Sequence, residues 1–170
     1  MSHNTDRAGW VFALALLLAA CTHVPPAPPA PDVQAMVADI DLAGQRDTSP
    51  LQVVPLRDPG VTRLLAQAAQ ARKQGQFARA ASLLDAALKH DPSAPGILQA
   101  RAEIAVLRRH YQHAEALARR SYALGPKLGS LCMRNWQTVM EMRYVAHDAA
   151  GIEAARKRRD ACRVKPVTRM

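Results

Sequence analysis

The sequence predicts an all-α protein built from a short helical repeat. Of its 170 residues, 49% are apolar but only 4% are aromatic, which argues against a β-sandwich or β-barrel and for packed helices. Three pairs of similar residues recur with a period of 34 positions: Phe77 and Tyr111, Ala80 and Ala114, and Pro92 and Pro126. The aromatic and small residues let a neighbouring helix approach closely, and the Pro closes each unit.

Turn and cap signals mark the helix boundaries. Asp58-Pro59 and Ala94-Pro95 predict helix starts, because Pro fits the first helical position. Gly125-Pro126 predicts a helix end. Two complete helix pairs are therefore expected between residue 58 and Pro126.

A third helix pair is expected to follow. Its first helix would run from Ser130 to about Ala146, and Asp148 could cap a second helix that runs to about Arg163. A strict 34-residue frame places Val145 where the aromatic residue should stand, so we expect a small insertion. The pair is either a degenerate repeat or the solvating cap that a solenoid needs at its end.

The segment Gly75–Pro92 closely resembles the second half of a tetratricopeptide repeat, and His110–Pro126 resembles it less closely. The resemblance covers roughly residues 61–163. It implies a short tetratricopeptide-like solenoid of about three helix pairs, and three units meet the stability minimum for such arrays.

Tetratricopeptide domains bind peptides or protein surfaces in a concave groove lined by the first helix of each repeat. The resemblance therefore implies a partner groove, and the alternative is that its residues make ordinary surface and inter-repeat contacts. Carried over by the repeat frame, the groove residues are Leu65, Arg72 and Lys73 from the first unit, Gln99, Glu103 and Val106 from the second, and Met133, Gln137 and Met140 from the third.

The N-terminus predicts an export signal. Trp10–Ala20 is an uncharged apolar run, too short for a bilayer span but suited to a signal peptide of residues 1–20. Leu18-Ala19-Ala20-Cys21 resembles the lipobox of bacterial lipoproteins, in which Cys21 is lipidated; the alternative is an ordinary signal with a chance Cys. In that family an Asp directly after the lipidated Cys favours retention in the inner membrane. Because Thr22 stands at that position here, the resemblance implies that the protein is anchored in the outer membrane and faces the periplasm.

Residues 21–57 are expected to form a Pro/Ala-rich tether. Residues 24–31 hold five Pro in eight positions, which favours extended polyproline II. Val33, Met36, Val37 and Ile40 have helical spacing, and this short helix either docks on the domain or forms on a partner. The helical domain is placed at 58–163 and a tail at 164–170.

Two cysteines remain after lipidation, Cys132 and Cys162. An even pair in an exported protein is a disulfide candidate. In an antiparallel helix pair, Cys132 near the start of one helix would face Cys162 near the end of the other. The expectation is a disulfide, and the alternative is two unpaired buried thiols.

The net charge of +9 is unevenly distributed. Residues 22–60 hold two basic and five acidic side chains, whereas residues 61–170 hold twenty and eight, so acidic partners are expected. A basic run stands late in the last helix: Arg156, Lys157, Arg158 and Arg159. The expected partners of this basic run are anionic lipid headgroups or peptidoglycan carboxylates. The alternative is that the run is a solvated face of the helix without a partner. Nucleic acid is not expected as a partner, because export separates the protein from it.

No catalytic constellation is recognisable in the sequence. His110 and His113 would be half of a metal site, but no acidic or Cys residues nearby complete it. The sequence has no Gly-rich phosphate-binding loop. No Ser or Cys that could act as a nucleophile has a candidate general base at the spacing of a recognisable catalytic motif. The sequence predicts neither enzyme activity nor a cofactor nor a bound metal.

The whole layout of lipid anchor, Pro-rich tether and small tetratricopeptide head resembles the outer-membrane lipoproteins that activate class A penicillin-binding proteins. That group includes a pseudomonad-type activator with a tetratricopeptide head. The resemblance implies an adaptor that stimulates a peptidoglycan synthase by binding it. The alternatives are a pilotin-like assembly factor for a secretin of type IV pili, which usually carries more repeats and no long tether, and a general envelope scaffold.

Overall fold

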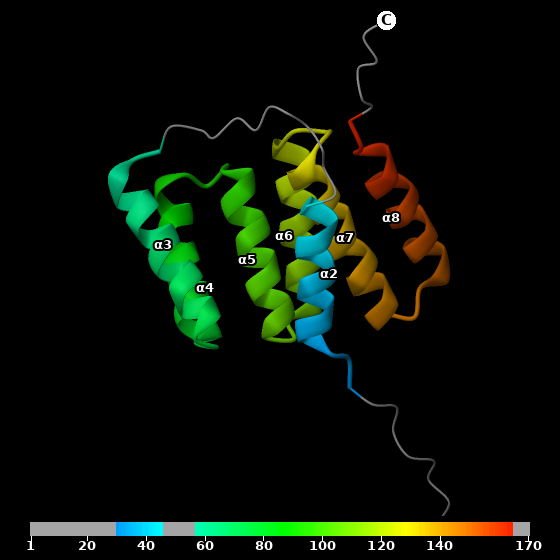
Figure 1. Cartoon of the computed structure of the whole chain (residues 1–170), viewed down its shortest axis with the longest axis horizontal. Coiled ribbons are helices and arrows are strands. Elements are labelled where there is room, and N and C mark those ends of the chain that lie inside the picture. The colour runs from blue at the N-terminus through cyan, green and yellow to red at the C-terminus, as the bar shows by residue number, and fades with distance from the viewer. Residues whose placement is uncertain (1–29, 46–56, 165–170) are drawn as a thin grey trace, which may run out of the picture. The chain divides into compact units, whose positions relative to one another are not determined.

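A computed structural model describes residues 30–45 and 57–164, and every regular element in these ranges is an α-helix (Figure 1). The fold is an all-α, tetratricopeptide-like solenoid, as predicted. The signal peptide, Cys21 and most of the Pro-rich run lie outside the described residues. The helices are α2 (Val33–Gln45), α3 (Pro59–Lys73), α4 (Phe77–His90), α5 (Pro95–Leu107), α6 (Tyr111–Leu124), α7 (Ser130–Val145) and α8 (Ala149–Ala161).

Local signals in the sequence account for the helix ends. Asp58 caps α3, because its Oδ1 accepts the backbone N–H of Gly60 over 2.7 Å, which satisfies one of the free donors at a helix start. Asp148 caps α8 in the same way by accepting the N–H of Gly151 over 2.8 Å. Pro95 is the first residue of α5, as expected from Ala94-Pro95.

The repeat period is visible in the backbone of the turns. The turns within the three helix pairs each contain one residue in the left-handed region: Gly75 (φ 70°), Arg109 (φ 60°) and His147 (φ 55°). The residue that follows each of them donates its backbone N–H to a carbonyl five positions earlier, at the end of the preceding helix. These hydrogen bonds run from Gln76 to Ala71, from His110 to Ala105 and from Asp148 to Arg143. The first helix of the third pair therefore ends in the same kind of turn as the first helices of the other two pairs.

The third unit is longer than the second. The left-handed residues are 34 positions apart between the first and second units and 38 between the second and third. Helix α7 accounts for most of this difference, because it has 16 residues where α5 has 13. The expected insertion is thus present, and Ala149 takes the place of the aromatic residue that begins α4 and α6.

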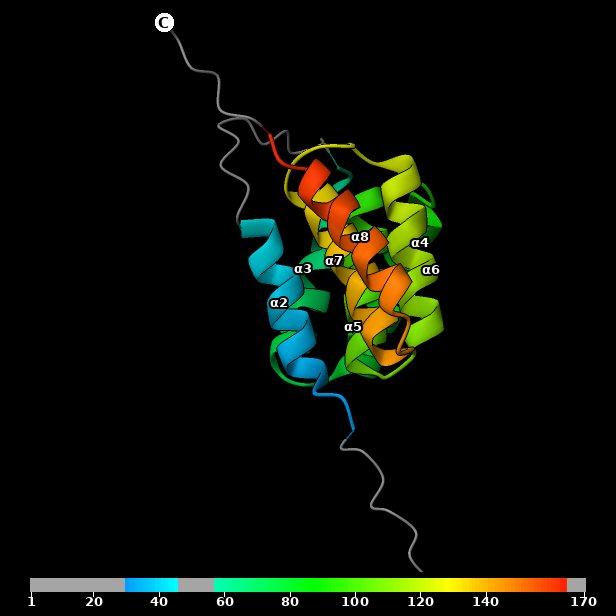
Figure 2. The same ribbon diagram turned by 90° about the vertical axis from the view of Figure 1, so that its right-hand side faces the viewer.

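Helix α2 packs onto the repeat. Together with α3, α5 and α7 it lies on the side away from α4 and α6 (Figure 2), and it contacts α7 and α5. Its apolar side chains Met36, Val37 and Ile40 are buried in the same core as Ile104 and Met142. Of the two alternatives for this segment, docking on the domain is the one observed. The packed unit therefore starts at Pro31, earlier than residue 58.

The last helix pair is closed by the Cys132–Cys162 disulfide, with Cα atoms 5.6 Å apart. Both cysteines are buried in a second core that also contains Trp136 of α7 and Ala155 of α8. The ring of Trp136 makes an edge-on contact with Tyr122, at 5.0 Å between centroids. Within residues 30–45 and 57–164, no helix has the length and apolar character needed to cross a membrane.

Candidate interaction site on the groove face

We call the side formed by α3, α5 and α7, the first helices of the three pairs, the groove face. Helix α2 lies against α5 and α7 on this face and runs antiparallel to α7, so the second and third units are covered (Figure 1). The end of α2 approaches α7 closely. A Cβ on Gly44 would lie 2.6 Å from Cδ of Arg134, and the absence of a side chain there permits this contact.

The covering helix changes the expected groove in the second unit. Gln99, Glu103 and Val106 are each 0% exposed. They are buried because α2 contributes its apolar side chains to the groove face, which sequence reasoning treated as open. The expectation of a continuous open groove through all three units is therefore wrong.

In the third unit the expected residues lie on a different side of the helix. Gln137 and Met140 contact Arg159 of α8, whose Nη1 lies 2.7 Å from Oε1 of Gln137 and 3.8 Å from Sδ of Met140. Met133 belongs to the buried cluster with Ala155 of α8. The cause is that α7 begins 35 positions after α5, not 34, so a strict frame misses the groove face by one residue.

Arg134 and Thr138 take the groove-face positions of α7 instead. Nε2 of Gln99 donates to Oγ1 of Thr138 over 2.9 Å, and Nη2 of Arg134 pairs with Oε1 of Glu103 over 2.5 Å. These contacts join α5 and α7 across the inter-repeat boundary. Sequence reasoning missed both residues. The helix starts expected at Pro95 and Ser130 are 35 positions apart, and this register relates Gln99 to Arg134 and Glu103 to Thr138.

Glu103 is the buried centre of an ionic network whose other members are partly exposed. It accepts hydrogen bonds from Gln99 (2.9 Å) and Arg72 (2.9 Å) and also pairs with Arg134. Asp41 of α2 joins the same two arginines, at 2.6 Å from Arg72 and 3.6 Å from Arg134. Two carboxylates thus balance two guanidinium groups, which a buried charge requires. The network links α2, α3, α5 and α7.

Beside this network the groove face stays open at its first unit. A cavity of about 620 Å³ lies between α2, α3 and α5. Its wall combines apolar side chains with charged ones at the rim. The residues that line it are Asp41, Arg57, Leu65, Ala68, Ala69, Arg72, Lys73, Leu84, Gly96, Ile97, Ala100, Glu103, Ile104 and Arg134. Of the expected groove residues, Leu65, Arg72, Lys73 and Glu103 are therefore brought together here.

The rim of this cavity carries excess positive charge. Arg72 and Arg134 are balanced by Asp41 and Glu103, as described above. Arg57 and Lys73 are exposed and form no ion pair with other described residues. The cavity thus offers an apolar wall and two uncompensated cations, which suits an acidic segment with an apolar side chain.

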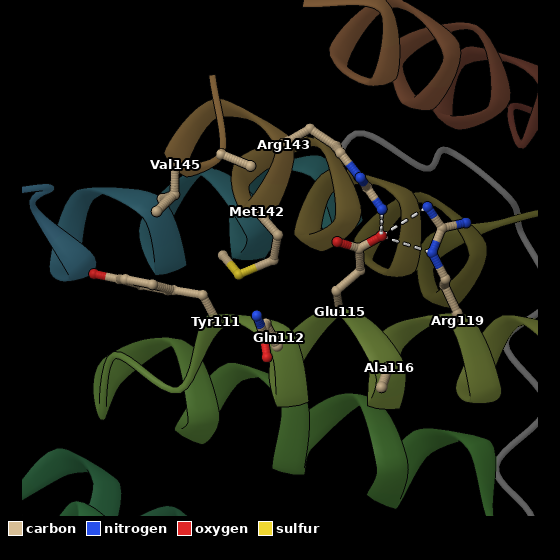
Figure 3. Close-up of a pocket in the computed structure, with 9 residues that line it drawn as sticks. Tyr111, Gln112, Glu115, Ala116, Arg119, Met142, Arg143 and Val145 are labelled. Atoms are coloured by element: carbon tan, nitrogen blue, oxygen red, sulfur yellow. Dashed lines mark hydrogen bonds and ion pairs between the residues drawn. The ribbon is translucent and has the colours of Figure 1, made fainter. Parts of the chain in front are cut away.

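A second cavity of about 590 Å³ lies between α6 and α7 (Figure 3). Its charged groups are paired with one another, because Glu115 accepts from both Arg119 and Arg143. Hydrogen bonding to Glu115 raises the pKa of Arg143. Arg143 also pairs with Asp148 at 3.2 Å. This cavity has less unbalanced charge to offer a partner than the one on the groove face.

The basic run of α8 is spread around the helix. The guanidinium of Arg158 stacks over the ring of Trp136 at 4.8 Å, and Arg159 turns toward α7 and Asp160. Arg156 and Lys157 are exposed and lie 3.8 Å and 3.9 Å from Glu153. Part of the run therefore packs and part faces solvent.

Within the described ranges, no three His, Cys, Asp or Glu residues come together as metal ligands. Burial, with the charge of Arg101, lowers the pKa of His113, which favours the neutral imidazole. The residues that line the groove-face cavity include no Ser, Thr, Cys or His, and its two carboxylates, Asp41 and Glu103, are both paired with arginines.

Comparison with known proteins agrees with this fold. The sequence model of the tetratricopeptide repeat family matches residues 60–104. Among solved structures, the globular C-terminal domain of P. aeruginosa LpoP is similar, with a TM-score of 0.58 and 26% sequence identity over 62% of this chain and 99% of that chain. No curated protein sequence matches the chain. The helical unit thus has a tetratricopeptide-like fold similar to that of the LpoP C-terminal domain, and residues 60–104 match the tetratricopeptide repeat family model.

Proposed function

We propose that this protein is a non-enzymatic adaptor that binds a peptidoglycan synthase of the penicillin-binding protein class and stimulates it. Three observations support the proposal. The head has a tetratricopeptide-like fold and its residues 60–104 match the tetratricopeptide repeat family model, and domains of this type act by binding other proteins. Its fold is similar to that of the P. aeruginosa LpoP C-terminal domain. The lipobox, tether and head together resemble the pseudomonad-type activators.

The observation that carries the proposal is the groove-face cavity. It places an apolar wall, including Leu65 and Ile97, beside the exposed cations Arg57 and Lys73. An acidic segment of a partner can bury an apolar side chain there and place its carboxylates next to the two cations. Electrostatic attraction of this kind speeds association and selects acidic partners.

The proposed domain organisation places the head in the periplasm. A signal peptide of residues 1–20 would direct export, and lipidation of Cys21 would anchor the chain in the outer membrane facing the periplasm. Several acyl chains on one residue hold a protein firmly in a bilayer. Because α2 is docked and the packed unit starts at Pro31, the tether is residues 22–30, which would reach about 28 Å at ~3.1 Å per residue when fully extended. This tether would hold the head in the periplasm close to the outer membrane.

The test is stimulation of a purified bifunctional penicillin-binding protein by the purified full-length protein. We expect the wild-type protein to raise the glycan polymerisation rate. Lys73→Glu is expected to weaken this effect at least tenfold in half-maximal concentration, because it reverses a charge on the cavity rim. The matched control is Lys89→Glu, since Lys89 is an exposed lysine in the last turn of the neighbouring helix α4. Lack of stimulation by the wild-type protein would overturn the proposal.

A further inference from the structure

Helix α2 has the charge and the spacing of apolar residues that are typical of a peptide helix bound in a protein groove. The described residues 30–45 contain three Asp and neither Lys nor Arg, although the chain as a whole has a net charge of +9. Its apolar residues Met36, Val37, Ile40 and Ala43 lie on one face of the helix and are buried. An acidic amphipathic helix with anchors at this spacing is the type of segment that helix-binding grooves accept.

The surface beneath α2 is basic where α2 is acidic. Asp41 meets Arg72 and Arg134, and Arg109 donates to the backbone carbonyl of Pro31 over 3.2 Å. The cationic contacts come from α3, α7 and the α5–α6 turn. They lie at both ends of α2: an ionic contact at Asp41 and a hydrogen bond to the backbone carbonyl at Pro31.

Without α2 this surface keeps one carboxylate between two guanidinium groups, so it has an excess positive charge that an acidic helix can balance. Glu103 is 0% exposed and pairs with both Arg72 and Arg134 through its two oxygens. Both arginines therefore keep an anionic partner when α2 is absent. Asp39 of α2, by contrast, lies near Glu141 of α7, and the two like charges oppose docking. The positive charge of the groove favours binding of an acidic helix, and the repulsion between Asp39 and Glu141 makes α2 a less favourable occupant than a helix without an acidic residue at that position.

We propose that α2 is an exchangeable occupant of the groove face, and that an acidic amphipathic helix of the partner protein takes its place on α5 and α7. The inference rests on the proposed adaptor function and names the chemistry of the partner. It also makes α2 a built-in competitor that limits binding by helices that match the groove only weakly.

A competitor in the same chain has a concentration advantage, on the order of millimolar for linked segments. A partner helix must therefore make contacts that α2 does not make. The open groove-face cavity provides them, because Asp41 and Arg134 border both the cavity and the α2 contact. A partner that first fills the cavity is positioned to replace α2 beside it.

The experiment uses the full-length protein and a fluorescent synthetic peptide of residues 31–45 as the probe. Ile40→Asp is expected to release α2, because Ile40 is 0% exposed under the helix. The matched control is Leu42→Asp, which adds the same charge to the solvent side of α2, where Leu42 is 47% exposed. Circular dichroism at 222 nm verifies that each variant is folded.

We expect the peptide to bind Ile40→Asp at least tenfold more tightly than the wild type or Leu42→Asp. A peptide with Asp41→Lys should bind at least tenfold more weakly than the unmodified peptide, because Asp41 is the residue that pairs with Arg72 and Arg134. Should Ile40→Asp lose its fold, Asp41→Lys provides a milder release of α2 and the same comparison. Equal affinity of the peptide for all folded variants, or no binding to any of them, would overturn the proposal.

The outcome is separable from that of the proposed function. Stimulation of a penicillin-binding protein by the wild-type protein tests the adaptor role without reference to α2. If stimulation occurs but the released groove does not bind the peptide, the adaptor role stands and the exchange of α2 fails.

Discussion

Arg72 of α3 donates to Glu103 of α5 over 2.9 Å, and through its other terminal nitrogen to Asp41 of α2 over 2.6 Å. One side chain therefore connects the first repeat unit, the second repeat unit and helix α2, which covers the second and third units. The Glu103 side chain is fully buried, whereas the Arg72 side chain is 31% exposed. This link forms the boundary between the covered and the open parts of the groove face.

Arg72→Met should destabilise the domain and loosen α2. Glu103 would keep Arg134 and Gln99, so we expect a loss of about 1–3 kcal/mol in the free energy of unfolding, less than for a fully orphaned buried charge. Urea unfolding followed at 222 nm measures this. Arg63→Met is the matched control, because Arg63 is exposed on the same helix and forms no ion pair with other described residues. Equal losses in both variants would contradict the assigned role of Arg72.

Removing the disulfide should lower stability without changing the fold. Cys132 and Cys162 are 30 positions apart, and closing a loop of that size is worth about 3–4 kcal/mol in the chain-entropy model. The double variant Cys132→Ser/Cys162→Ser should unfold at lower urea concentration than the oxidised wild type. A reducing agent should shift the wild type toward the variant and leave the variant unchanged; a wild type unaffected by complete reduction would argue against this stabilisation.

Glu141→Gln should stabilise the domain at neutral pH. Burial is the main cause that raises the pKa of Glu141, and the nearby Asp39 adds to it. A raised pKa means that the folded state holds the proton more tightly, so stability is lost as pH rises through the folded-state pKa, above 4.5. The advantage of the Gln variant should therefore be largest near pH 7 and shrink toward pH 4.

Thermal unfolding at several pH values tests this. Glu153→Gln is the control, since its side chain is 52% exposed on α8. A Glu141→Gln advantage that does not depend on pH would show that the substitution acts by another route.

His147→Gly should raise stability, because His147 has a left-handed backbone (φ 55°) where the first unit has Gly75. Relief of that conformation is worth about 1–2 kcal/mol, and the added flexibility of Gly offsets about 0.5–1 kcal/mol. The neighbouring Ala146→Gly is the control, since Ala146 has a right-handed backbone (φ −81°) and should lose stability. Urea unfolding that ranks both variants below the wild type would contradict the turn assignment.

Much of the fold could be predicted from local sequence. Asp58-Pro59, Ala94-Pro95 and Asp148 marked helix starts because caps and Pro act within one turn of the chain. The 34-residue period identified two units because it reflects packing between adjacent helices. The Cys132–Cys162 pair followed from the antiparallel order of the last two helices.

The groove was harder to predict, since it depends on contacts between distant segments. Helix spacing in residues 33–40 indicated an amphipathic helix but not the surface that it covers. One additional residue before α7 turned Met133, Gln137 and Met140 away from the groove face and placed Arg134 and Thr138 there. Asp41 and Arg57 contribute to the site from outside the repeat frame, so no repeat pattern could indicate them.

The central claim is that the groove-face cavity contacts a peptidoglycan synthase. Site-specific photo-cross-linking in living cells tests it most directly, with the photoreactive residue at Ala69, an exposed position in the cavity wall. The control position is Ser82, which is exposed on α4. We predict an adduct with a penicillin-binding protein, identified by mass spectrometry, from position 69 and not from position 82. The absence of that adduct at position 69, or equal yield at both positions, would contradict the account.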